Sequence, residues 1–527
     1  MDARRLAPYD SFMSGKRPAS RGRIIKVDLA AFQAEPLHRR IYLSLRRDIV
    51  DGVIMPGASL PSSRRLAADL RVSRGTVVTA YEQLRGEGYL DANLGGGTRV
   101  AGSVPDLCLR AANEPTQIGS AADARRPSRR GRQIADDWRS VPFEFMQAGP
   151  RAFRSTPPAI DIFPIDTWSR IASRQWRRAT TRDLSYGQPM GYLPLRRVIA
   201  DHVRAIRGVR CTVEQVMVVA GTQQAMDISA RALLDPGDSA WIEDPAYFGA
   251  RGALVAAGAT IVPVGVDDEG MDVLEGQRLC PNARLAIVTP SHQVPLGVPL
   301  SASRRRLLLE WAESANSFII EDDYNSDFQY ATRPLAALQA ADNRGRVVYC
   351  GTFNKSLFPG LRVGFVVVPE PLIDAFVGTR FFSDIQPPYL EQATLAEFIA
   401  DGHYERHIRR LRAIYQARRD LLLSELTQCS PWLTPAQYDS GREVAVWLDP
   451  ALDDVFVAQA AKRADVDVMP LSPWAIAHPL RPSLRLGYSG IDETDIRTGV
   501  HRLAEVLRAC SARVRTRGWS SPITVAS

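Results

Sequence analysis

The chain has 527 residues, too many for one hydrophobic core, and this length indicates about two to four domains. No apolar run reaches the ~18 residues that a membrane-spanning helix needs. The basic N-terminus lacks the apolar segment of a secretory signal. The six scattered cysteines form no CxxC pair and have no zinc-ligand spacing. Residues 1–140 hold 24 Lys and Arg against 15 Asp and Glu, a net charge of +9, whereas the whole chain carries +8. We therefore expect a cytoplasmic chain with free thiols, no metal site, no membrane partner and a basic excess confined to its N-terminal part.

The N-terminal part divides into a tail and a small domain. Residues 1–30 mix Arg, Ser, Gly and Pro without periodicity, which predicts a disordered basic N-terminus. A domain over residues 31–101 follows. Its first helix is predicted over 36–51, because apolar residues recur there on one helical face at Leu37, Ile41, Leu45 and Ile49.

Two further helices are predicted over residues 64–70 and 73–87, on either side of a tight turn. Ser62 or Ser63 is placed to cap the first of them. Residues 88–100 predict two short strands joined by a glycine turn. Two helices around a tight turn, followed by a β-hairpin, make an α+β winged helix-turn-helix, whose second helix enters the major groove of DNA.

Candidate DNA contacts lie at the start of these helices and on the hairpin. Arginine bonds guanine edges or phosphates, serine and threonine serve phosphates or bases, and a glycine turn can approach the minor groove closely. The basic charge alone also fits a solvated tail or a protein-interaction surface. The predicted DNA-binding residues are Arg64, Ser73, Arg74, Thr76, Gly96 and Thr98.

The rest of the chain predicts a linker and an α/β domain. Residues 102–140 are rich in Ala, Arg, Pro, Ser and Asp, and predict a flexible linker. Over 141–512, helical segments alternate with short apolar runs typical of a sheet buried on both faces, and the second part of this range predicts a small α/β subdomain. Residues 513–527 predict a frayed tail. The apolar runs are Val216–Ala220, Ser239–Ile242, Leu285–Val288, Phe318–Ile320, Val347–Tyr349 and Val363–Val368.

Lys355 and Asp322 suggest chemistry with an aldehyde cofactor. Lys355 lies among small polar residues between two predicted strands, and burial near cations makes such an amine a usable nucleophile. Asp322 follows an apolar strand, at the end where α/β sheets bind ligands, and a carboxylate there can keep a pyridine nitrogen protonated. Arg362 and Thr352 offer donors for a phosphate. Taken singly, these residues also fit a solvated lysine, a capping aspartate and an ordinary ion pair.

Two weaker signals surround this pair. Residues 221–224 follow a predicted strand and open a helix, and a helix N-terminus with small residues suits a phosphate. Tyr247 follows the next strand and could stack on an aromatic cofactor, although a tyrosine after proline is more often simple packing.

Together, residues 141–512 resemble the fold-type I aminotransferases that use pyridoxal 5'-phosphate (PLP), in the subgroup of kynurenine and aminoadipate aminotransferases. The resemblance implies an α/β fold with a large domain built on a seven-stranded, mostly parallel sheet, and a small C-terminal subdomain. The matching segments are Tyr186–Gly191, Gly221–Gln224, Glu243–Tyr247, Thr289–Gly297, Glu321–Tyr324, Thr352–Lys355 with Arg362, and Ser483–Gly487.

The resemblance also implies a role for each matching residue. Lys355 forms the Schiff base with PLP, and Asp322 pairs with the pyridine nitrogen. Arg485 receives the carboxylate of a ligand. The other implied cofactor contacts are Tyr247 on the ring, Tyr324 with His292 or Gln293 at the phenolic oxygen, Thr222, Gln223, Thr352, Asn354 and Arg362 at the phosphate, and Tyr186 at the phosphate of a neighbouring subunit.

Residues 60–90 resemble the GntR-type winged helix, and the whole arrangement resembles the MocR/GabR family of transcription regulators. This resemblance implies a double-stranded DNA operator, a small-molecule effector and a head-to-tail, domain-swapped homodimer. In GABA-responsive members an arginine lies two positions after the tyrosine of the Pro-x-Tyr segment, but here that position is Gly249.

Two functions are open at this point. The first is a PLP-dependent regulator whose DNA binding changes with an amine, an amino acid or PLP itself; such a protein needs at most a residual or half-transamination activity. The second is an active aminotransferase that carries a DNA-binding domain. Retention of Arg485 favours an amine or amino-acid ligand.

Overall fold

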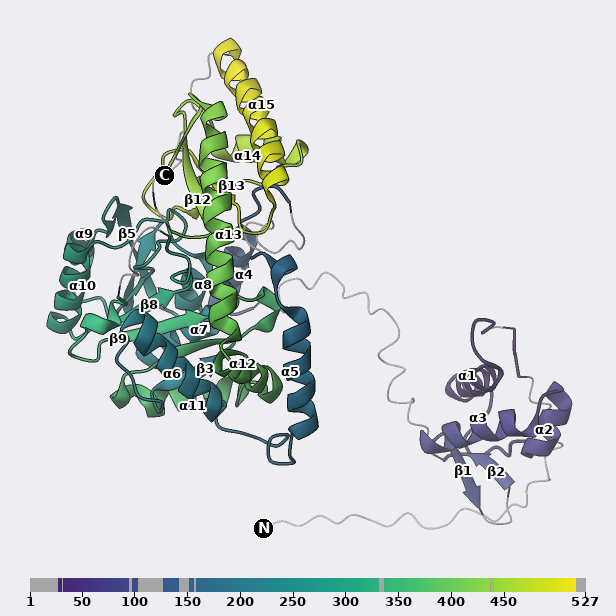
Figure 1. The fold of residues 1–527 in the computed structure, drawn as a ribbon. Helices are drawn as coiled ribbons and strands as arrows, with labels where there is room; N and C mark the ends of the chain where they lie inside the picture. Colours follow the sequence, from purple (N-terminus) through teal and green to yellow (C-terminus); the bar gives the residue numbers. More distant parts are fainter. Residues whose placement is uncertain are drawn as a thin grey trace, which may run out of the picture. The chain divides into compact units, whose positions relative to one another are not determined.

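The chain divides into two compact units, Met1–Arg126 and Pro127–Ser527 (Figure 1). The computed structural model describes residues 27–30, 32–93, 97–102, 127–141, 151–155, 158–330, 336–436, 438 and 440–517. Gly96, residues 1–26 of the predicted disordered segment 1–30 and residues 518–527 of the predicted tail lie outside the described residues, as does most of the predicted linker, 103–126.

The first unit is a winged helix-turn-helix, as predicted. Its apolar helical face packs inward, with Ile41 and Leu45 fully buried against Leu66, Val77 and Leu84. A two-stranded antiparallel wing follows the third helix. The elements are α1 (Leu37–Val50), α2 (Ser63–Leu70), α3 (Arg74–Gly86), β1 (Leu90–Asn93) and β2 (Gly97–Val100).

Local capping fixes the turn between α2 and α3. The Ser62 hydroxyl accepts the backbone N–H of Arg65, which confirms one of the two predicted caps. Arg71 ends α2 in the left-handed conformation (φ 54°), and Ser73 then caps α3 by accepting the N–H of Thr76 at 3.1 Å. Each cap satisfies an amide that would otherwise lack a partner at a helix start.

The second unit contains a mixed sheet of eight strands within the described residues, in the order β3-β10-β9-β8-β7-β4-β5-β6. The central strands β9, β8, β7, β4 and β5 are parallel, while β10 is antiparallel to both of its neighbours. A mostly parallel sheet is therefore confirmed, but the predicted number of seven strands is wrong. The extra strand β6 is a two-residue segment that folds back on β5, which Gly270 permits by its positive φ of 93°. The bounds are β3 (Val216–Val219), β4 (Ser239–Asp244), β5 (Thr260–Asp267), β6 (Gly270–Met271), β7 (Leu285–Val288), β8 (Phe318–Asp323), β9 (Val347–Thr352) and β10 (Gly364–Val367).

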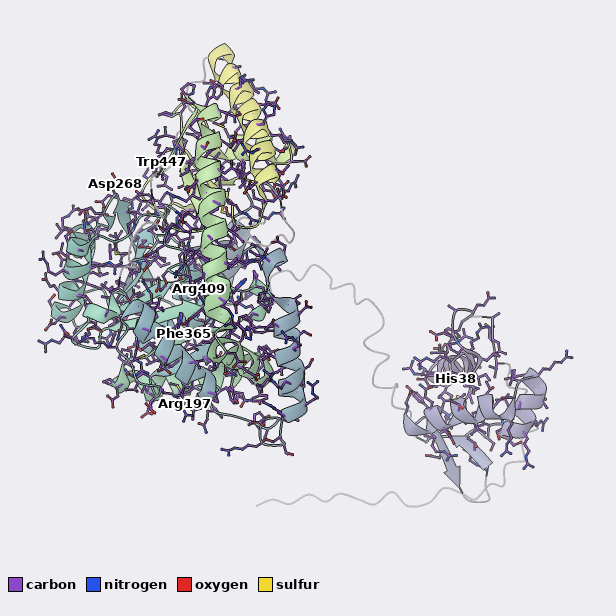
Figure 2. The ribbon with its side chains drawn as sticks, in the orientation of Figure 1. His38, Arg197, Asp268, Phe365, Arg409 and Trp447 are labelled. Atoms are coloured by element: carbon purple, nitrogen blue, oxygen red, sulfur yellow. The ribbon has the colours of Figure 1, made fainter. Side chains whose placement is uncertain are left out.

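Helices cover both faces of this sheet. Val216 and Val218 face one layer, formed near them by α6 and α12, and Met217 and Val219 face the opposite layer of α7, α8 and α11. Phe365 on β10 lies inside the unit, where side chains fill the space between sheet and helices (Figure 2). The helices are α5 (Ile165–Arg178), α6 (Leu193–Arg207), α7 (Thr222–Leu233), α8 (Phe248–Ala257), α9 (Val273–Leu279), α10 (Ala302–Ser314), α11 (Ile373–Asp384) and α12 (Tyr389–Ala400), with short 3-10 turns at Ile160–Ile162, Gln339–Ala341, Pro359–Leu361 and Glu370–Leu372.

The predicted small C-terminal subdomain is built on an antiparallel sheet in the order β11-β12-β14-β13 within the described residues. The long helix α13 contacts both α12 and α15, so it joins the two parts of the unit (Figure 1). The elements are α13 (His403–Glu425), β11 (Leu433–Pro435), β12 (Glu443–Leu448), α14 (Asp454–Arg463), β13 (Met469–Pro470), β14 (Ser483–Gly487) and α15 (Glu493–Arg517), with 3-10 turns at Leu426–Cys429 and Ser472–Trp474.

One segment of the predicted flexible linker is helical. Residues 129–140 form α4 (Arg129–Ser140), which packs on α8, and Asp137 of α4 pairs with Arg251 of α8 at 2.6 Å. Ile134 and Trp138 remain exposed. The linker prediction is wrong for this segment, because the helix docks through a polar tertiary contact and not through the apolar face on which sequence periodicity depends.

Both domain ends also extend beyond their predicted bounds. Val27 and Leu29, predicted as disordered, pack against the core of the first unit. Helix α15 continues to Arg517, beyond the predicted end at residue 512. The described cysteines, at 211, 280, 350, 429 and 510, are free thiols as expected. No described helix is long and apolar enough to cross a bilayer.

Candidate cofactor and DNA-binding sites

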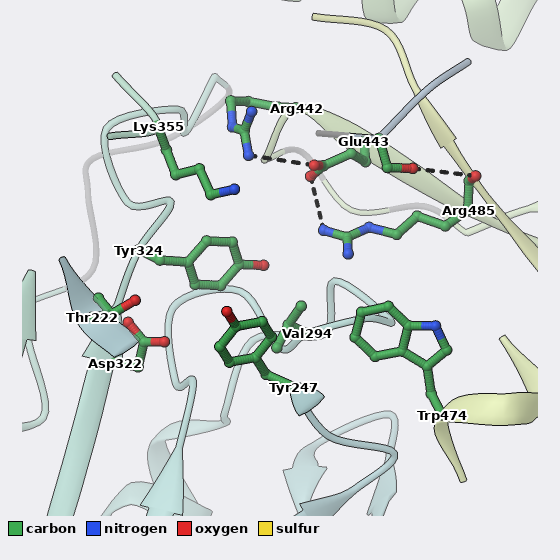
Figure 3. Close-up of a pocket in the computed structure, with 11 residues that line it drawn as sticks. Thr222, Tyr247, Val294, Asp322, Tyr324, Lys355, Arg442, Glu443, Trp474 and Arg485 are labelled. Carbon is green, nitrogen blue, oxygen red and sulfur yellow. Dashed lines mark hydrogen bonds and ion pairs between the residues drawn. The ribbon is translucent and has the colours of Figure 1, made fainter. Parts of the chain in front are cut away.

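A cavity of about 520 Å³, including its open mouth, lies in the second unit between the carboxyl ends of the parallel strands and the small subdomain. The fold brings six of the predicted site residues together there, and the small subdomain contributes others (Figure 3). The lining residues are Ser155, Thr222, Tyr247, Val294, Asp322, Tyr324, Lys355, Arg442, Glu443, Trp474 and Arg485.

Lys355 follows β9 and is half-buried in this cavity. Burial above all, together with Arg442 and Arg485, lowers the pKa of its amine to about 7, while Glu443 and Asp322 oppose this shift. A substantial neutral fraction therefore exists near neutral pH, as a nucleophilic amine requires.

Asp322 lies on β8, next to β9, and is 4% exposed. Burial raises the pKa of its carboxyl to about 8, with Asp323 and Glu243 adding to the rise and Lys355 opposing it. Its Oδ1 has no hydrogen-bond partner among the described residues. A buried acceptor of this kind needs a donor, and a protonated pyridine nitrogen is such a donor.

The start of α7 suits a phosphate. Gly221 precedes the helix with φ 90°, and a Cβ atom there would lie 2.6 Å from Asn354 Nδ2 and 3.6 Å from the Arg362 guanidinium. Thr222 is the first residue of the helix and lines the cavity. Backbone amides, an amide NH₂ and a guanidinium thus converge, and this donor set fits the phosphate of PLP.

Three predicted phosphate ligands hold other partners. The Gln223 side chain donates to the Gly249 carbonyl at 2.9 Å, so it supports the start of α8. Thr352 Oγ1 accepts the backbone N–H of Asn354 at 3.2 Å, and Asn354 Oδ1 accepts that of Val363 at 3.1 Å. Both Thr352 and Asn354 therefore shape the loop that carries Lys355.

The two alternatives for the phenolic oxygen behave differently. The His292 ring lies 6.2 Å from the Tyr324 ring and makes a 3.0 Å hydrogen bond with Ser440. Burial lowers the pKa of His292 to about 4, so the ring is neutral at neutral pH. Gln293 donates to the Pro245 and Val294 carbonyls and supports the backbone.

Tyr186 is 82% exposed and does not line the cavity. Its contact with a neighbouring subunit stays a prediction.

Arg485 carries the least expected feature of the cavity. Its guanidinium, on β14, pairs with Glu443 on β12 (Nη2–Oε2 3.0 Å), and Glu443 also pairs with Arg442 (Oε1–Nη2 3.3 Å) (Figure 3). Burial raises the pKa of Glu443, but Arg485 and then Arg442 outweigh it and lower the pKa to about 2. The arginine predicted to receive a ligand's carboxylate thus already holds one from the protein. We call Arg442, Glu443 and Arg485 the ion triad.

Sequence reasoning missed Arg442, Glu443, Ser155, Val294 and Trp474. Glu443 and Arg485 lie diagonally across an antiparallel pair in which Ala445 faces Arg485. The neighbouring charges Arg442 and Glu443 at the start of an apolar strand were the available signal. Their contact with Arg485 depends on the register between two strands, which one segment of sequence does not reveal.

The described part of the first unit presents the predicted DNA contacts Arg64, Ser73, Arg74, Thr76 and Thr98 at least partly exposed. Arg64 is exposed on the first turn of α2, and Arg74 is exposed at the first residue of α3. Ser73 and Thr76 are hydrogen-bonded to each other at the start of α3, beside the exposed Arg74. Thr98 is half-buried on the wing, next to the exposed Arg99, a cation that the sequence prediction did not include.

Comparisons with known proteins agree with the two units of the fold. Residues 37–100 match the family described as bacterial regulatory proteins, gntR family, and residues 163–503 match aminotransferase class I and II. The chain is 38% identical over 475 residues to the probable rhizopine catabolism regulatory protein MocR of Rhizobium meliloti, covering 90% of this chain and 94% of the relative. This chain belongs to the MocR-type transcription regulators.

Further relatives extend the agreement. The HTH-type transcriptional regulator TauR of Rhodobacter capsulatus is 31% identical, with 90% of this chain and 96% of TauR covered. Among solved structures, the kynurenine aminotransferase of Pyrococcus horikoshii in complex with PMP matches with a TM-score of 0.63 and 25% identity, over 76% of this chain and 99% of that one. This MocR-type regulator thus binds DNA through its GntR-type unit, and the second unit has the fold of PLP-dependent aminotransferases.

Proposed function

We propose that this regulator senses an amine or amino acid, or PLP itself, in the cavity of its second unit and changes its DNA binding in response. The observation that carries the proposal is Lys355, whose amine has a pKa near 7, in one cavity with the unpartnered carboxylate oxygen of Asp322. A structural ion pair does not need a lysine of lowered pKa beside a carboxyl oxygen that has no hydrogen-bond partner. The exchange of amines on a bound aldehyde needs both.

Each part of the cavity has a task in such a sensor. When bound, PLP supplies an aldehyde that links to amines and a ring that withdraws electrons. Asp322 would hold the proton of the ring nitrogen, while the start of α7, Asn354 and Arg362 would bind the phosphate. Lys355 would hold the aldehyde until an effector's amine took its place, and release of the lysine side chain would then occur beside the ion triad.

The release must favour one DNA-binding state over another, because a ligand shifts an equilibrium only by its difference in affinity for the two states. Helix α8 supports a route for this change. It begins immediately after Tyr247, its first residue Phe248 packs on Trp474 with ring centroids 4.2 Å apart, and its Arg251 holds α4. Helix α8 thus connects the cavity wall to α4, the first helix of the second unit.

A homodimer, head-to-tail and domain-swapped, is part of the proposal. An exposed apolar surface supports it: Leu184 and Tyr186 on one segment, and Phe382 on another, are 64–83% exposed. The two segments are adjacent, because the Gly187 N–H donates to the Gln386 side chain. Monomers rarely expose such a patch. Phe382→Glu should lower the mass measured by light scattering from that of a dimer, whereas an unchanged dimer would contradict this interface.

An active aminotransferase is the second candidate, because Lys355, Asp322 and Arg485 are all retained in one cavity. Multiple turnover of an amino donor with a keto acid at ordinary transaminase rates would favour this function. A single half-reaction would favour the sensor.

The test of the sensor compares the full-length holo-protein with Lys355→Ala and with Lys462→Ala, a lysine on α14 outside the cavity. Lys355→Ala should lose the visible absorption band of the lysine-linked cofactor and the response of DNA affinity to amines, as measured by fluorescence anisotropy. Lys462→Ala should retain both. A Lys355→Ala protein with an unchanged spectrum and response would contradict the proposal.

A further inference from the structure

The ion triad bears on the chemical class of the effector. Glu443 and Arg485 are each 5% exposed, and Arg442 is 1% exposed. Their charges are therefore largely removed from water and depend on one another. Breaking such a pair leaves a buried charge without compensation, which is far more costly than breaking a pair at the surface.

Both arginines of the described cavity wall already pair with a carboxylate of the protein. Arg442 and Arg485 each pair with Glu443, and Lys355 is the residue that would hold the cofactor. A ligand carboxylate at Arg485 would have to displace Glu443 and leave it with Arg442 alone. An uncharged ligand group leaves the triad intact.

The unused hydrogen-bond donors of the wall indicate what that group is. Arg442 Nη1 and Trp474 Nε1 are buried without a hydrogen-bond partner among the described residues. Both are N–H donors, and Trp474 also lies against the Arg485 guanidinium, 6.0 Å from its ring centroid. Buried donors are satisfied by acceptors, and a hydroxyl or ether oxygen accepts without adding charge.

We infer that the effector is a primary amine that carries neutral oxygen groups and no carboxylate, in the manner of an amino alcohol, and that Glu443 occupies at Arg485 the place of a ligand's carboxylate. This inference rests on the proposed sensing of amines by the PLP-loaded cavity. It replaces the predicted role of Arg485 as the receptor of an effector carboxylate.

Matched pairs of ligands test the inference on the full-length holo-protein. Ethanolamine is compared with glycine, and 2-amino-1-propanol with alanine, so that each pair differs only in a hydroxymethyl group or a carboxylate. The cofactor absorbance and the DNA affinity are recorded during titration. Each amino alcohol should produce the half-maximal change at a concentration at least about tenfold lower than its amino acid.

Glu443→Gln adds a second test, since it removes the internal carboxylate and keeps the side-chain size. The concentration of amino acid that produces the half-maximal change should then fall at least about tenfold. Amino acids should also raise the melting temperature of this variant more than that of the wild type. The matched control is Glu310→Gln on α10, whose carboxylate pairs with Arg306 at the surface and which should keep the wild-type order. If Glu443→Gln does not fold, the inference is decided by the half-maximal concentrations of the amino alcohols and amino acids on the wild type.

The possible failures are distinguishable. Amino acids that act at the lower concentration on the wild type, with DNA affinity responding, would overturn the inference and leave the proposed sensor standing. A Glu443→Gln protein that folds and keeps the wild-type order would also overturn it. No response to either class of ligand in absorbance or DNA affinity would overturn the proposed amine sensor, and the inference with it.

Discussion

The two units place their functional charges in opposite ways. In the first, Arg64 and Arg74 are exposed on helix starts and are free to reach a polyanion. In the second, Asp322, Glu443 and Arg485 are nearly fully buried, and the pKa values of both carboxyls are far from the ordinary range. The comparison teaches that binding a large external polyanion uses cations that remain solvated, whereas holding a small cofactor uses charges that burial has made dependent on their partners.

The largest expected effect is on the stability of the second unit. Glu443→Ala leaves Arg442 and Arg485 buried without their common partner, and breaking a buried pair in this way costs about 3–5 kcal/mol. Chemical denaturation should show the loss in the transition of the second unit, while the transition of the first unit stays unchanged. Glu310→Gln, at the surface, should cost less than about 0.5 kcal/mol. Equal losses of unfolding free energy for the two variants would show that the buried carboxylate contributes no more to stability than the surface carboxylate.

The next effect concerns cofactor affinity. Asp322→Asn keeps the size of the side chain but removes the charge that pairs with the protonated ring nitrogen, and a hydrogen bond to a charged group contributes about 1.5–3 kcal/mol. The dissociation constant for PLP, measured by titration of the apo-protein, should rise roughly tenfold to more than a hundredfold. Arg74→Ala is the matched control and should load cofactor as the wild type does. A wild-type dissociation constant for Asp322→Asn would contradict the assignment of this carboxylate.

On the DNA side, Arg74→Ala should cost about 1–3 kcal/mol of operator affinity if the guanidinium contacts a base. Wild-type affinity should also fall steeply with salt, because the exposed arginines displace counterions from DNA. Anisotropy titrations on operator and random DNA at several salt concentrations measure both. An equal loss on both DNAs would make Arg74 a phosphate contact, and no loss would exclude it from the interface.

The smallest effect is a pH dependence. His478 pairs with Asp244 at 2.8 Å and with Glu275 at 3.1 Å. Partial burial lowers the pKa of His478, but the hydrogen bonds to these two carboxylates outweigh it and raise the pKa above 6.5. The protonated form thus stabilises the fold fully below the unfolded-state pKa, and this contribution is lost as the pH rises through the raised pKa.

His478→Gln should therefore lower the melting temperature more at about pH 5.5 than at about pH 8.5. The half-exposed ring limits the effect to less than about 1 kcal/mol. If His478→Gln lowers the melting temperature equally at both pH values, the two carboxylates do not stabilise the fold through the charge of His478.

The sequence predicts much of the fold, because its signals are local. The face formed by Leu45 and its neighbours, the Ser62 cap and the apolar strands are each contained in a few consecutive residues. The site around Lys355 and Asp322 is predictable for the same reason, since each residue lies in a recognisable short segment at a strand end.

The remaining features depend on tertiary contacts. Glu443 meets Arg485 only through the register of β12 and β14, and no local pattern near either residue contains the other. Likewise, α4 is held to α8 by a pair between Asp137 and Arg251, more than one hundred residues apart in the chain. Long-range polar pairs of this kind leave no periodicity in the sequence.

The docking of α4 has a consequence for protein engineering. Because this helix belongs to the second unit, the natural point for joining that unit to a different DNA-binding domain is at Pro127, before the helix, and not at Val141, where the predicted linker ends. A chimera joined at Val141 would lack the partner of Arg251 and would leave the surface of α8 uncovered. A chimera joined at Pro127 would retain the helix as a built-in adaptor, so a biosensor with a new output domain should begin there.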